Sequence, residues 1–312
     1  MNLGYAEDGL PLGADGGGRQ PRAGFVALIG RPNVGKSTLM NHIMGMKLAI
    51  TSRKPQTTRK RIRCVYTEER GQIVFLDTPG IHRPKNKLGE FMTDAALSTL
   101  KEADAAVWLV EPVNSIGERE KEIAGLIEKA GVPTVLAVNK CDTVKNNVLP
   151  PILEKYGQLA DFHKVIAISG KHSIGKEELL CALFSLLPYG EPFYDEETVT
   201  EETERSLVSE LIREQVLRCL SEEVPHGVAV DIESMKEEKK LYRIDATLYC
   251  EKESHKGIII GKGGETLKKI GTGARIEAEK LLDRKVLLKI WVKVRKDWRD
   301  DEKQIRAFGY RK

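Results

Sequence analysis

Gly30-Arg31-Pro32-Asn33-Val34-Gly35-Lys36-Ser37 is the stretch that decides the fold of the first half of this chain. It matches the pattern GxxxxGK[ST] and lies between the apolar run FVALI (25–29) and the helical pattern STLMNHIM (37–44). The glycines let backbone N–H groups surround a phosphate, and the following helix adds the positive end of its dipole. The stretch therefore predicts a phosphate-binding loop, in which Lys36 reaches the β- and γ-phosphates and the Ser37 hydroxyl ligates Mg²⁺.

Apolar runs alternate with helical patterns on the C-terminal side of this loop. Strands are expected at 24–29, 72–77, 105–110, 134–138 and 165–168, and helices at 37–46, 88–100, 117–130, 147–158 and 176–187. The near-continuous apolar character of the strands is typical of a sheet that is covered on both faces. The alternation predicts an α/β domain with a doubly wound, mostly parallel sheet over residues 23–187, which binds its ligand at the carboxyl ends of the strands.

Two further short motifs fall where a nucleotide site at this sheet edge needs them. After the strand at 72–77 comes DTPG, in which the Asp77 carboxylate can hold Mg²⁺ through water and the Gly80 N–H can approach the γ-phosphate. The stretch PQTTR (55–59) offers two threonines that could close on Mg²⁺ only when the γ-phosphate is present. We favour Thr58 for this contact, with Thr57 as the alternative. The residues expected to act in catalysis are Lys36, Thr58 and Gly80.

Asn139-Lys140-Cys141-Asp142, which follows the strand at 134–138, decides the base. The Asp142 carboxylate can accept hydrogen bonds from N1–H and N2–H₂ of guanine, whereas adenine would leave this anion unsatisfied. Asn139 is expected to tie the neighbouring loops together, and the Lys140 stem to lie along the base. Ser169-Gly170-Lys171, again at a strand end, is expected to supply a backbone N–H to the guanine carbonyl. These motifs indicate GTP rather than ATP.

In this order the five motifs resemble those of the translation-factor-like GTPases. The resemblance is to the branch with a hydrophobic residue after DTPG, here Ile81, where Ras-like proteins carry a water-orienting Gln; it implies slow intrinsic turnover. Relatives with an Asn at the Asn33 position can use K⁺ in place of an arginine finger, so K⁺ is a second candidate cofactor beside Mg²⁺. The expected metal ligands are Ser37, Thr58 and Asp77, and the expected GTP contacts are residues 30–37, Thr38, Asp77, Thr78, Pro79, Gly80, Ile81, Asn139, Lys140, Cys141, Asp142, Ser169, Gly170 and Lys171.

Composition argues against a disulfide-linked, zinc-binding or membrane-spanning protein, and the charge distribution indicates a polyanionic partner. The five cysteines are scattered without CxxC spacing, so neither a disulfide framework nor a zinc site is expected. No apolar run approaches the roughly 20 residues that span a bilayer, and residues 1–22 are expected to be a disordered leader. Residues 191–240 carry 15 acidic and 6 basic side chains, whereas residues 252–312 carry 18 basic and 9 acidic ones. The basic end indicates a polyanionic partner, nucleic acid first and a membrane surface second.

A second domain is expected at 202–312, after an acidic linker at 188–201. Its pattern is helix, strand, strand, helix, GKGG, helix, strand, which resembles a smaller α+β KH domain of the bacterial type. GKGG (261–264) matches the GxxG loop that clamps single-stranded RNA. A groove beside it is expected from Ile259, Ile260, Leu267 and Ile270, with a plain core role as the alternative; for Trp298, base stacking and packing are both open. The expected RNA contacts are Ile260, Gly261, Lys262, Gly263, Gly264, Lys268, Lys269, Arg295, Trp298 and Arg299.

A GTPase domain followed by this KH domain, ending in WVKVRKDW and FGY, is similar to the Era family over residues 23–312. The resemblance implies a GTP-hydrolysing switch that binds the 3′ end of small-subunit ribosomal RNA and helps to mature the 30S subunit. It also implies peripheral contact with the inner membrane; we expect a cytoplasmic monomer. The alternatives are an RNA-binding module with a structural nucleotide site, another GTPase of the same branch such as a transfer-RNA modification enzyme, and an ATP-using P-loop enzyme.

Overall fold

The computed structural model describes residues 20–52 and 54–310, and their contacts divide the chain into two units. The first unit contains the residues up to Lys47, Arg61–Ile81 and Ala95–Glu201. The second contains Leu48–Lys60, His82–Asp94 and the residues from Glu202 onward. The segments 48–60 and 82–94, which the sequence pattern groups with the nucleotide domain, thus make most of their contacts in the second unit.

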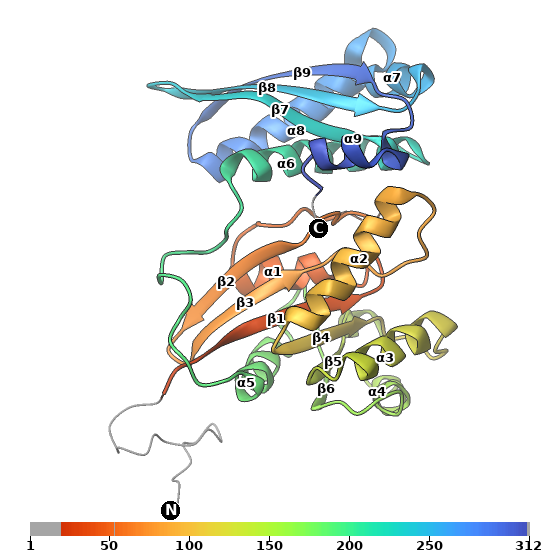
Figure 1. Ribbon diagram of the computed structural model, residues 1–312, viewed down its shortest axis with the longest axis vertical. Helices are drawn as coiled ribbons and strands as arrows, with labels where there is room; N and C mark the ends of the chain where they lie inside the picture. Colours follow the sequence, from red (N-terminus) through yellow and green to blue (C-terminus); the bar gives the residue numbers. More distant parts are fainter. Residues whose placement is uncertain (1–19, 53, 311–312) are drawn as a thin grey trace, which may run out of the picture. The chain divides into compact units, whose positions relative to one another are not determined.

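The first unit is built on a six-stranded sheet of order β2-β3-β1-β4-β5-β6 (Figure 1). Every neighbouring pair is parallel except β2 and β3, which are antiparallel. The five expected strands and the mostly parallel sheet are confirmed; the edge strand β2 was not predicted, because IRCVYTE mixes polar and apolar residues. The strands are β1 (Arg22–Gly30), β2 (Ile62–Glu68), β3 (Gly71–Asp77), β4 (Ala105–Val110), β5 (Thr134–Val138) and β6 (Lys164–Ala167).

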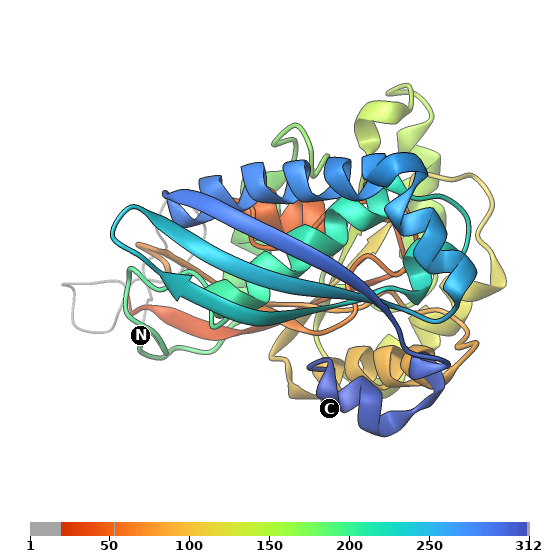
Figure 2. The ribbon, with the colours of Figure 1, turned by 90° about the horizontal axis from the view of Figure 1, so that it is seen from above.

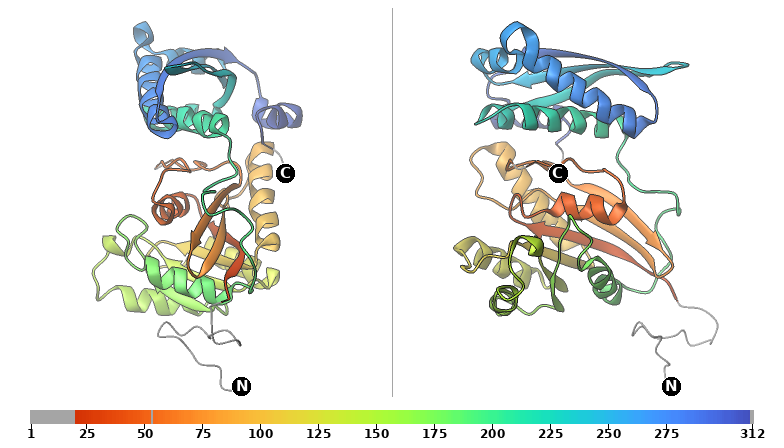
Figure 3. Two further views of the ribbon diagram at one scale, coloured as in Figure 1. Left: turned by 90° about the vertical axis from the view of Figure 1, so that its left-hand side faces the viewer. Right: turned by 180° about the vertical axis from the view of Figure 1, so that it is seen from behind.

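Helices cover both faces of this sheet, as the apolar strands require. Helices α2 (Lys87–Glu102), α3 (Glu118–Ala130) and α4 (Leu149–Gly157) pack on one face through a core that includes Trp108 and Tyr156. Helices α1 (Lys36–Met44) and α5 (Lys176–Leu186) lie on the opposite face (Figure 3). All five expected helices are confirmed. None of the helices in the described part of the chain is long and apolar enough to cross a membrane.

The last residue of the expected leader and several residues of the expected linker lie at the first sheet. Residues 1–19 of the expected leader lie outside the described residues, and β1 already begins at Arg22. Within the expected linker, the backbone N–H groups of Phe193 and Tyr194 donate to the buried Gln72 side chain at 2.8 and 3.0 Å. Val65 N donates to the Val199 carbonyl at 3.0 Å. Residues 188–201 therefore pack along β2 and β3 as part of the first unit.

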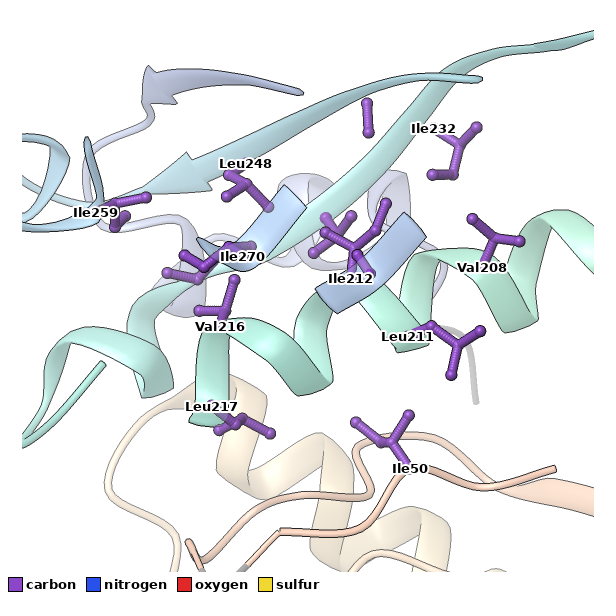
Figure 4. Close-up of a cluster of buried hydrophobic side chains, with 14 of the residues drawn as sticks. Ile50, Val208, Leu211, Ile212, Val216, Leu217, Ile232, Leu248, Ile259 and Ile270 are labelled. Atoms are coloured by element: carbon purple, nitrogen blue, oxygen red, sulfur yellow. The ribbon is translucent and has the colours of Figure 1, made fainter. Parts of the chain in front are cut away.

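The second unit has the expected helix–strand–strand–helix–turn–helix–strand order. Its sheet has the order β7-β8-β9, with β7 antiparallel and β9 parallel to β8. Helices α6 and α8 pack on one face of this sheet (Figure 2) around a core shown in Figure 4. The elements are α6 (Glu204–Cys219), β7 (Ala229–Glu237), β8 (Leu241–Cys250), α7 (Glu253–Ile260), α8 (Glu265–Leu282), β9 (Lys285–Val294) and α9 (Glu302–Ala307), with short 3₁₀ turns at Val224–Gly227, Lys262–Gly264 and Trp298–Asp300.

Candidate nucleotide site and nucleic-acid interface

The phosphate loop connects β1 to α1 in the first unit. Gly35 has a φ of 102°, and a Cβ there would lie 2.3 Å from Asn139 Nδ2, so only glycine fits. Lys36 folds back over the loop, where its Nζ donates to the Gly30 carbonyl at 3.2 Å and to the Arg31 carbonyl at 3.1 Å. These bonds hold the ammonium group inside the loop, as a phosphate-binding role requires.

Burial changes the acidity of Lys36. Its side chain is buried, and the loss of hydration lowers the pKa to about 8, while the Asp77 carboxylate acts in the opposite direction. Above that pH the unliganded loop loses the positive charge that a phosphate needs.

Nucleotide binding should therefore weaken as the pH rises above about 8. Bound phosphates favour the ammonium form, so the ligand must bring back a proton that the free loop has lost, and affinity falls by up to about tenfold per pH unit. Titration of a fluorescent guanine nucleotide at pH 7, 8 and 9 measures this. A Lys36→Arg variant, which stays protonated, should bind more weakly at every pH and with a smaller dependence on pH. Equal wild-type affinity at pH 7 and pH 9 would contradict the expectation.

Ser37 and Asp77 present oxygen atoms side by side. Ser37 Oγ, in the first turn of α1, donates to Asp77 Oδ2 at 2.7 Å, and Asp77 is fully buried at the end of β3. The two meet because β1 and β3 are parallel neighbours, whose carboxyl ends lie at one sheet edge. Hydroxyl and carboxylate oxygens are the ligands that Mg²⁺ prefers, so this pair fits the metal role predicted for it.

Gly80 and Ile81, which follow β3, shape the site in different ways. A Cβ on Gly80 would lie 2.5 Å from Pro32 N, so the absence of a side chain lets DTPG approach the phosphate loop. The Ile81 backbone N–H donates to the Gly30 carbonyl at 3.1 Å. The Ile81 side chain is buried in the core with Trp108, and this agrees with the expectation that it does not orient water. Its contribution to the site is through its backbone.

The guanine motif is built by one amide and two loops. Asn139 Nδ2 donates to the Val34 carbonyl at 2.7 Å, and its Oδ1 accepts from Gly170 N at 2.8 Å, which confirms that it ties the loops together. Asp142 is partly exposed on the turn after β5, as a base-reading carboxylate must be. The neighbouring Ser169 side chain is the main cause that holds the pKa of Asp142 below its usual value, so the carboxylate stays ionised at neutral pH.

Two acidic residues near the site were missed in the sequence. Glu111, directly after β4, pairs with Lys140 Nζ, which also donates to the Asn33 carbonyl at 2.7 Å. Glu120 on α3 accepts from Arg31 Nη1 at 2.7 Å and is buried. Glu111 could have been found, because it lies at the carboxyl end of a strand beside β5. Glu120 carries no such signal; only the packing of α3 brings it to the phosphate loop.

Thr57 and Thr58 belong to the second unit by their contacts. The Thr57 hydroxyl donates to the Lys54 carbonyl at 2.7 Å, and its own carbonyl accepts from Arg213. The Thr58 side chain is buried. Metal ligation by Thr58, with Thr57 as the alternative, stays a prediction.

The GKGG turn joins α7 to α8 in a conformation that requires glycine. Gly261, Gly263 and Gly264 have φ values of 74°, 59° and 81°, and a Cβ on Gly261 would lie 2.2 Å from Thr266 Oγ1. Lys262 is exposed on the turn, and Ile260 before it is partly exposed. Lys268 and Lys269 are exposed on the first turns of α8, an 18-residue helix. The turn thus offers a positively charged helix N-terminus that phosphates can approach.

Several other RNA-contact expectations need correction. Trp298 is fully buried, and its Nε1 donates to the Gly227 carbonyl at 2.9 Å, so its ring is not available to stack on a base. Arg299 pairs with the Glu251 carboxylate at 3.0 Å, and its contact with phosphate stays a prediction. Ile259 and Ile270 are core residues rather than groove residues. Trp298 is buried because the chain after β9 folds back on its own domain, whereas Arg299 is partly exposed and Arg295 is exposed.

Two family models match the two parts of the chain. Residues 25–140 match the family described as 50S ribosome-binding GTPase, and residues 223–299 match the KH domain family. Among curated proteins, the chain is 47% identical over 291 residues to GTPase Era of Clostridium kluyveri, with 93% of this chain and 99% of the relative covered. It is 49% identical, with the same coverage, to GTPase Era of Alkaliphilus oremlandii.

Two solved structures match over both parts of the chain. A variant of Aquifex aeolicus Era bound to GDP·AlF4⁻ is 36% identical with a TM-score of 0.90, and 93% of this chain and 99% of that chain are covered. A structure of Era in complex with MgGDPNP and nucleotides 1506–1542 of 16S ribosomal RNA is 37% identical with a TM-score of 0.89 and the same coverage.

Proposed function

Since the chain belongs to the Era family of GTPases, we propose that it is a GTP-hydrolysing switch whose KH domain binds the 3′ end of small-subunit ribosomal RNA during assembly of the 30S subunit. Its reaction is the hydrolysis of GTP to GDP and phosphate. The observation that carries the proposal is the presence, in one chain, of a guanine-reading loop at Asn139–Asp142 and a glycine turn at Gly261–Gly264.

Different residues are assigned to different parts of GTP. Lys36 neutralises charge on the β- and γ-phosphates, the Gly80 N–H reaches the γ-phosphate, and Asp142 selects guanine. Ser37 and Asp77 would hold Mg²⁺, which when bound neutralises charge that develops on the phosphates. We assign Thr58 as a further metal ligand. A relative solved with MgGDPNP supports the assignment of magnesium.

The first unit offers no side chain after DTPG that could orient the attacking water. The residue after DTPG is Ile81, whose side chain is in the core, so it holds no water against the γ-phosphate. We infer that intrinsic turnover is slow and that bound RNA or a ribosomal partner raises it, as in switches that complete their site on binding.

Potassium is the second cation that we assign, on the basis of Asn33. Turnover should fall several-fold when Na⁺ replaces K⁺ at equal ionic strength, because Na⁺ is too small to take the place of the arginine charge at this loop. Steady-state rates of GTP hydrolysis in KCl and NaCl buffers of equal concentration measure this effect. The Asn33→Ala variant should have equal rates in the two salts. Equal wild-type rates in the two salts would remove K⁺ from the mechanism.

The GKGG turn, with Lys262, Lys268 and Lys269 beside it, is assigned to the RNA backbone. The basic C-terminal segment supports this assignment through its charge, and the relative solved with nucleotides 1506–1542 of 16S ribosomal RNA indicates the target. Ile260 and the exposed Arg295 complete the proposed contacts. Peripheral membrane contact, a monomeric state and a cytoplasmic location stay predictions.

GTP hydrolysis by the full chain, with and without an RNA that carries the 3′ end of 16S ribosomal RNA, tests the proposal. RNA should stimulate hydrolysis, and a variant with bulky side chains at Gly261 and Gly264 should lose the stimulation while it keeps the basal rate. Robust hydrolysis with no response to RNA would leave the GTPase and remove the switch. Normal ribosome assembly in cells that carry only Lys36→Ala would support the alternative of an RNA-binding module with a structural nucleotide site.

A further inference from the structure

Residues 48–52 and 54–60 lie along helix α6 of the second unit, and their contacts extend over its length. Ile50 contributes to the core beneath α6, near Leu211 and Leu217 (Figure 4). The Lys54 ammonium donates to carbonyls at the C-terminal end of the helix, where the dipole favours a cation. The polar contacts, from the N-terminal to the C-terminal end of α6, are Lys60 with Glu202 and Ser206, Thr57 with Arg213, Thr51 with Glu214, and Lys54 with Leu217 and Leu220.

Near the end of this segment, the Arg59 side chain lies in a closed socket. Its side chain is only 1% exposed. Nη1 donates to the Val228 carbonyl at 2.7 Å and to the Tyr310 hydroxyl at 3.3 Å, and Nη2 donates to the His226 carbonyl at 2.8 Å. The Trp298 ring lies 5.8 Å from the guanidinium carbon. A fork-shaped cation is therefore held by three neutral oxygen atoms and an aromatic face, which a lysine could match only in part.

The socket belongs to the proposed RNA-binding domain, and its carbonyls are all used. Trp298 Nε1 occupies the Gly227 carbonyl, so three consecutive carbonyls, those of residues 226–228, are all used as acceptors. These residues lead directly into β7, whose sheet carries the KH core. A charge that leaves such a socket partway loses its hydrogen bonds before water replaces them. Arg59 should therefore be either seated or withdrawn, with no stable position between.

The segment after DTPG contacts the same part of the second unit. Leu88, Phe91 and Met92 of α2 share a buried cluster with Trp298 and Tyr310. The rings of Phe91 and Tyr310 are 6.5 Å apart in an edge contact. Arg59 follows Thr58, and helix α2 follows Gly80 of DTPG. Both therefore contact Trp298 and Tyr310 of the C-terminal tail.

We propose that Arg59 is the positioning residue that couples the two domains: its place in the socket of residues 226–228, Trp298 and Tyr310 depends on the nucleotide, and it sets RNA affinity. Arg59 follows Thr58 directly, and one extended residue spans only about 3.3–3.6 Å. A change at Thr58 when the γ-phosphate is lost must therefore displace Arg59 or strain its seat. The inference rests on the proposed function, since it assigns to one side chain the coupling that a switch requires.

The test is the RNA affinity of the full chain in two nucleotide states. Fluorescence anisotropy with a labelled 16S 3′-end oligonucleotide gives the Kd at saturating GDP and at saturating GDPNP. The wild-type ratio of the two Kd values should be at least about fivefold, the lower end of typical coupling. Arg59→Met, which keeps the volume of the stem, should bring the ratio to within about twofold of one. Arg59→Lys should restore part of it, because the charge returns without the fork.

Arg61→Ala is the matched control, since Arg61 lies two residues on and pairs with Glu102 in the first unit. It should keep the wild-type ratio. A wild type without coupling would contradict the proposed switch, whatever the role of Arg59. A coupled wild type with an equally coupled Arg59→Met would overturn the assignment of Arg59.

If Arg59→Met does not fold, Tyr310→Phe removes one oxygen of the socket and should lower the ratio of the two Kd values at least twofold. An unchanged ratio in this variant would also overturn the assignment of Arg59.

Discussion

Replacing Asp142 by Asn should lower the affinity for guanine nucleotides by roughly 10²- to 10⁴-fold and create a preference for xanthine nucleotides. The carboxylate accepts two hydrogen bonds from guanine, and each charged hydrogen bond contributes about 1.5–3 kcal/mol. An asparagine amide can still accept from N1–H, but it presents N–H₂ to the guanine N2–H₂. Xanthine has a carbonyl at that position, so the variant gains a partner there. Titration with GDP and with XDP measures both changes.

Asp161→Asn is the control for this experiment, since Asp161 is an exposed carboxylate of the first unit. It should leave both affinities unchanged. Wild-type selectivity should be constant between pH 6 and 8, because the Ser169 side chain lowers the pKa of Asp142 and its charge is complete in that range. A variant that binds GDP as the wild type does would show that base recognition lies elsewhere.

Aspartates at Gly261 and Gly264 together should lower RNA affinity by at least about 100-fold and leave GTP affinity unchanged. Both positions have positive φ, with φ/ψ of 74°/175° and 81°/7°, where a non-glycine residue costs about 1–3 kcal/mol each. The new side chain at position 261 also overlaps Thr266, and both carboxylates repel phosphate. RNA anisotropy and nucleotide titration on the same preparation separate the two activities.

Gly257→Asp separates charge from backbone shape. This glycine lies in α7, one turn before GKGG, and a Cβ there meets no atom within 4 Å. The substitution adds one of the two negative charges of the double variant near the turn without requiring a left-handed backbone, so the loss of RNA affinity should be only a few-fold. If it equals the loss in the double variant, electrostatics rather than the shape of the turn carries recognition. Unaltered RNA binding by the double variant would remove GKGG from the interface.

Local patterns in the sequence determined most of the nucleotide site. A strand–loop–helix unit fixes the phosphate loop within eight residues, and parallel strands bring their carboxyl ends together. Ser37 and Asp77 therefore meet at 2.7 Å although 40 residues separate them. For the same reason Asn139 reaches both Val34 and Gly170. The position of the GKGG turn between two helices was likewise predictable, because the order of the elements around it indicates it.

What the sequence left open depends on contacts between segments that are distant in the chain. Trp298 could stack on RNA or pack, and only the fold of the tail against Gly227 and Tyr310 decided for packing. Strand β2 exists because it pairs with β3, and residues 188–201 pack on the same two strands. Neither feature has a local pattern that would predict it.

The same limit applies to Arg59, whose role no local pattern reveals. In the sequence it is a polar residue after two threonines, typical of an exposed loop. In the structure it is one of the most deeply buried side chains, because carbonyls, a tryptophan and a tyrosine from residues 226–310 surround it. The sequence by itself thus determined the two domains and the chemistry of each site, since these depend on short-range backbone geometry. Only the tertiary structure decided which unit residues 48–60 pack against, because burial of a charge depends on partners that the chain brings together at long range.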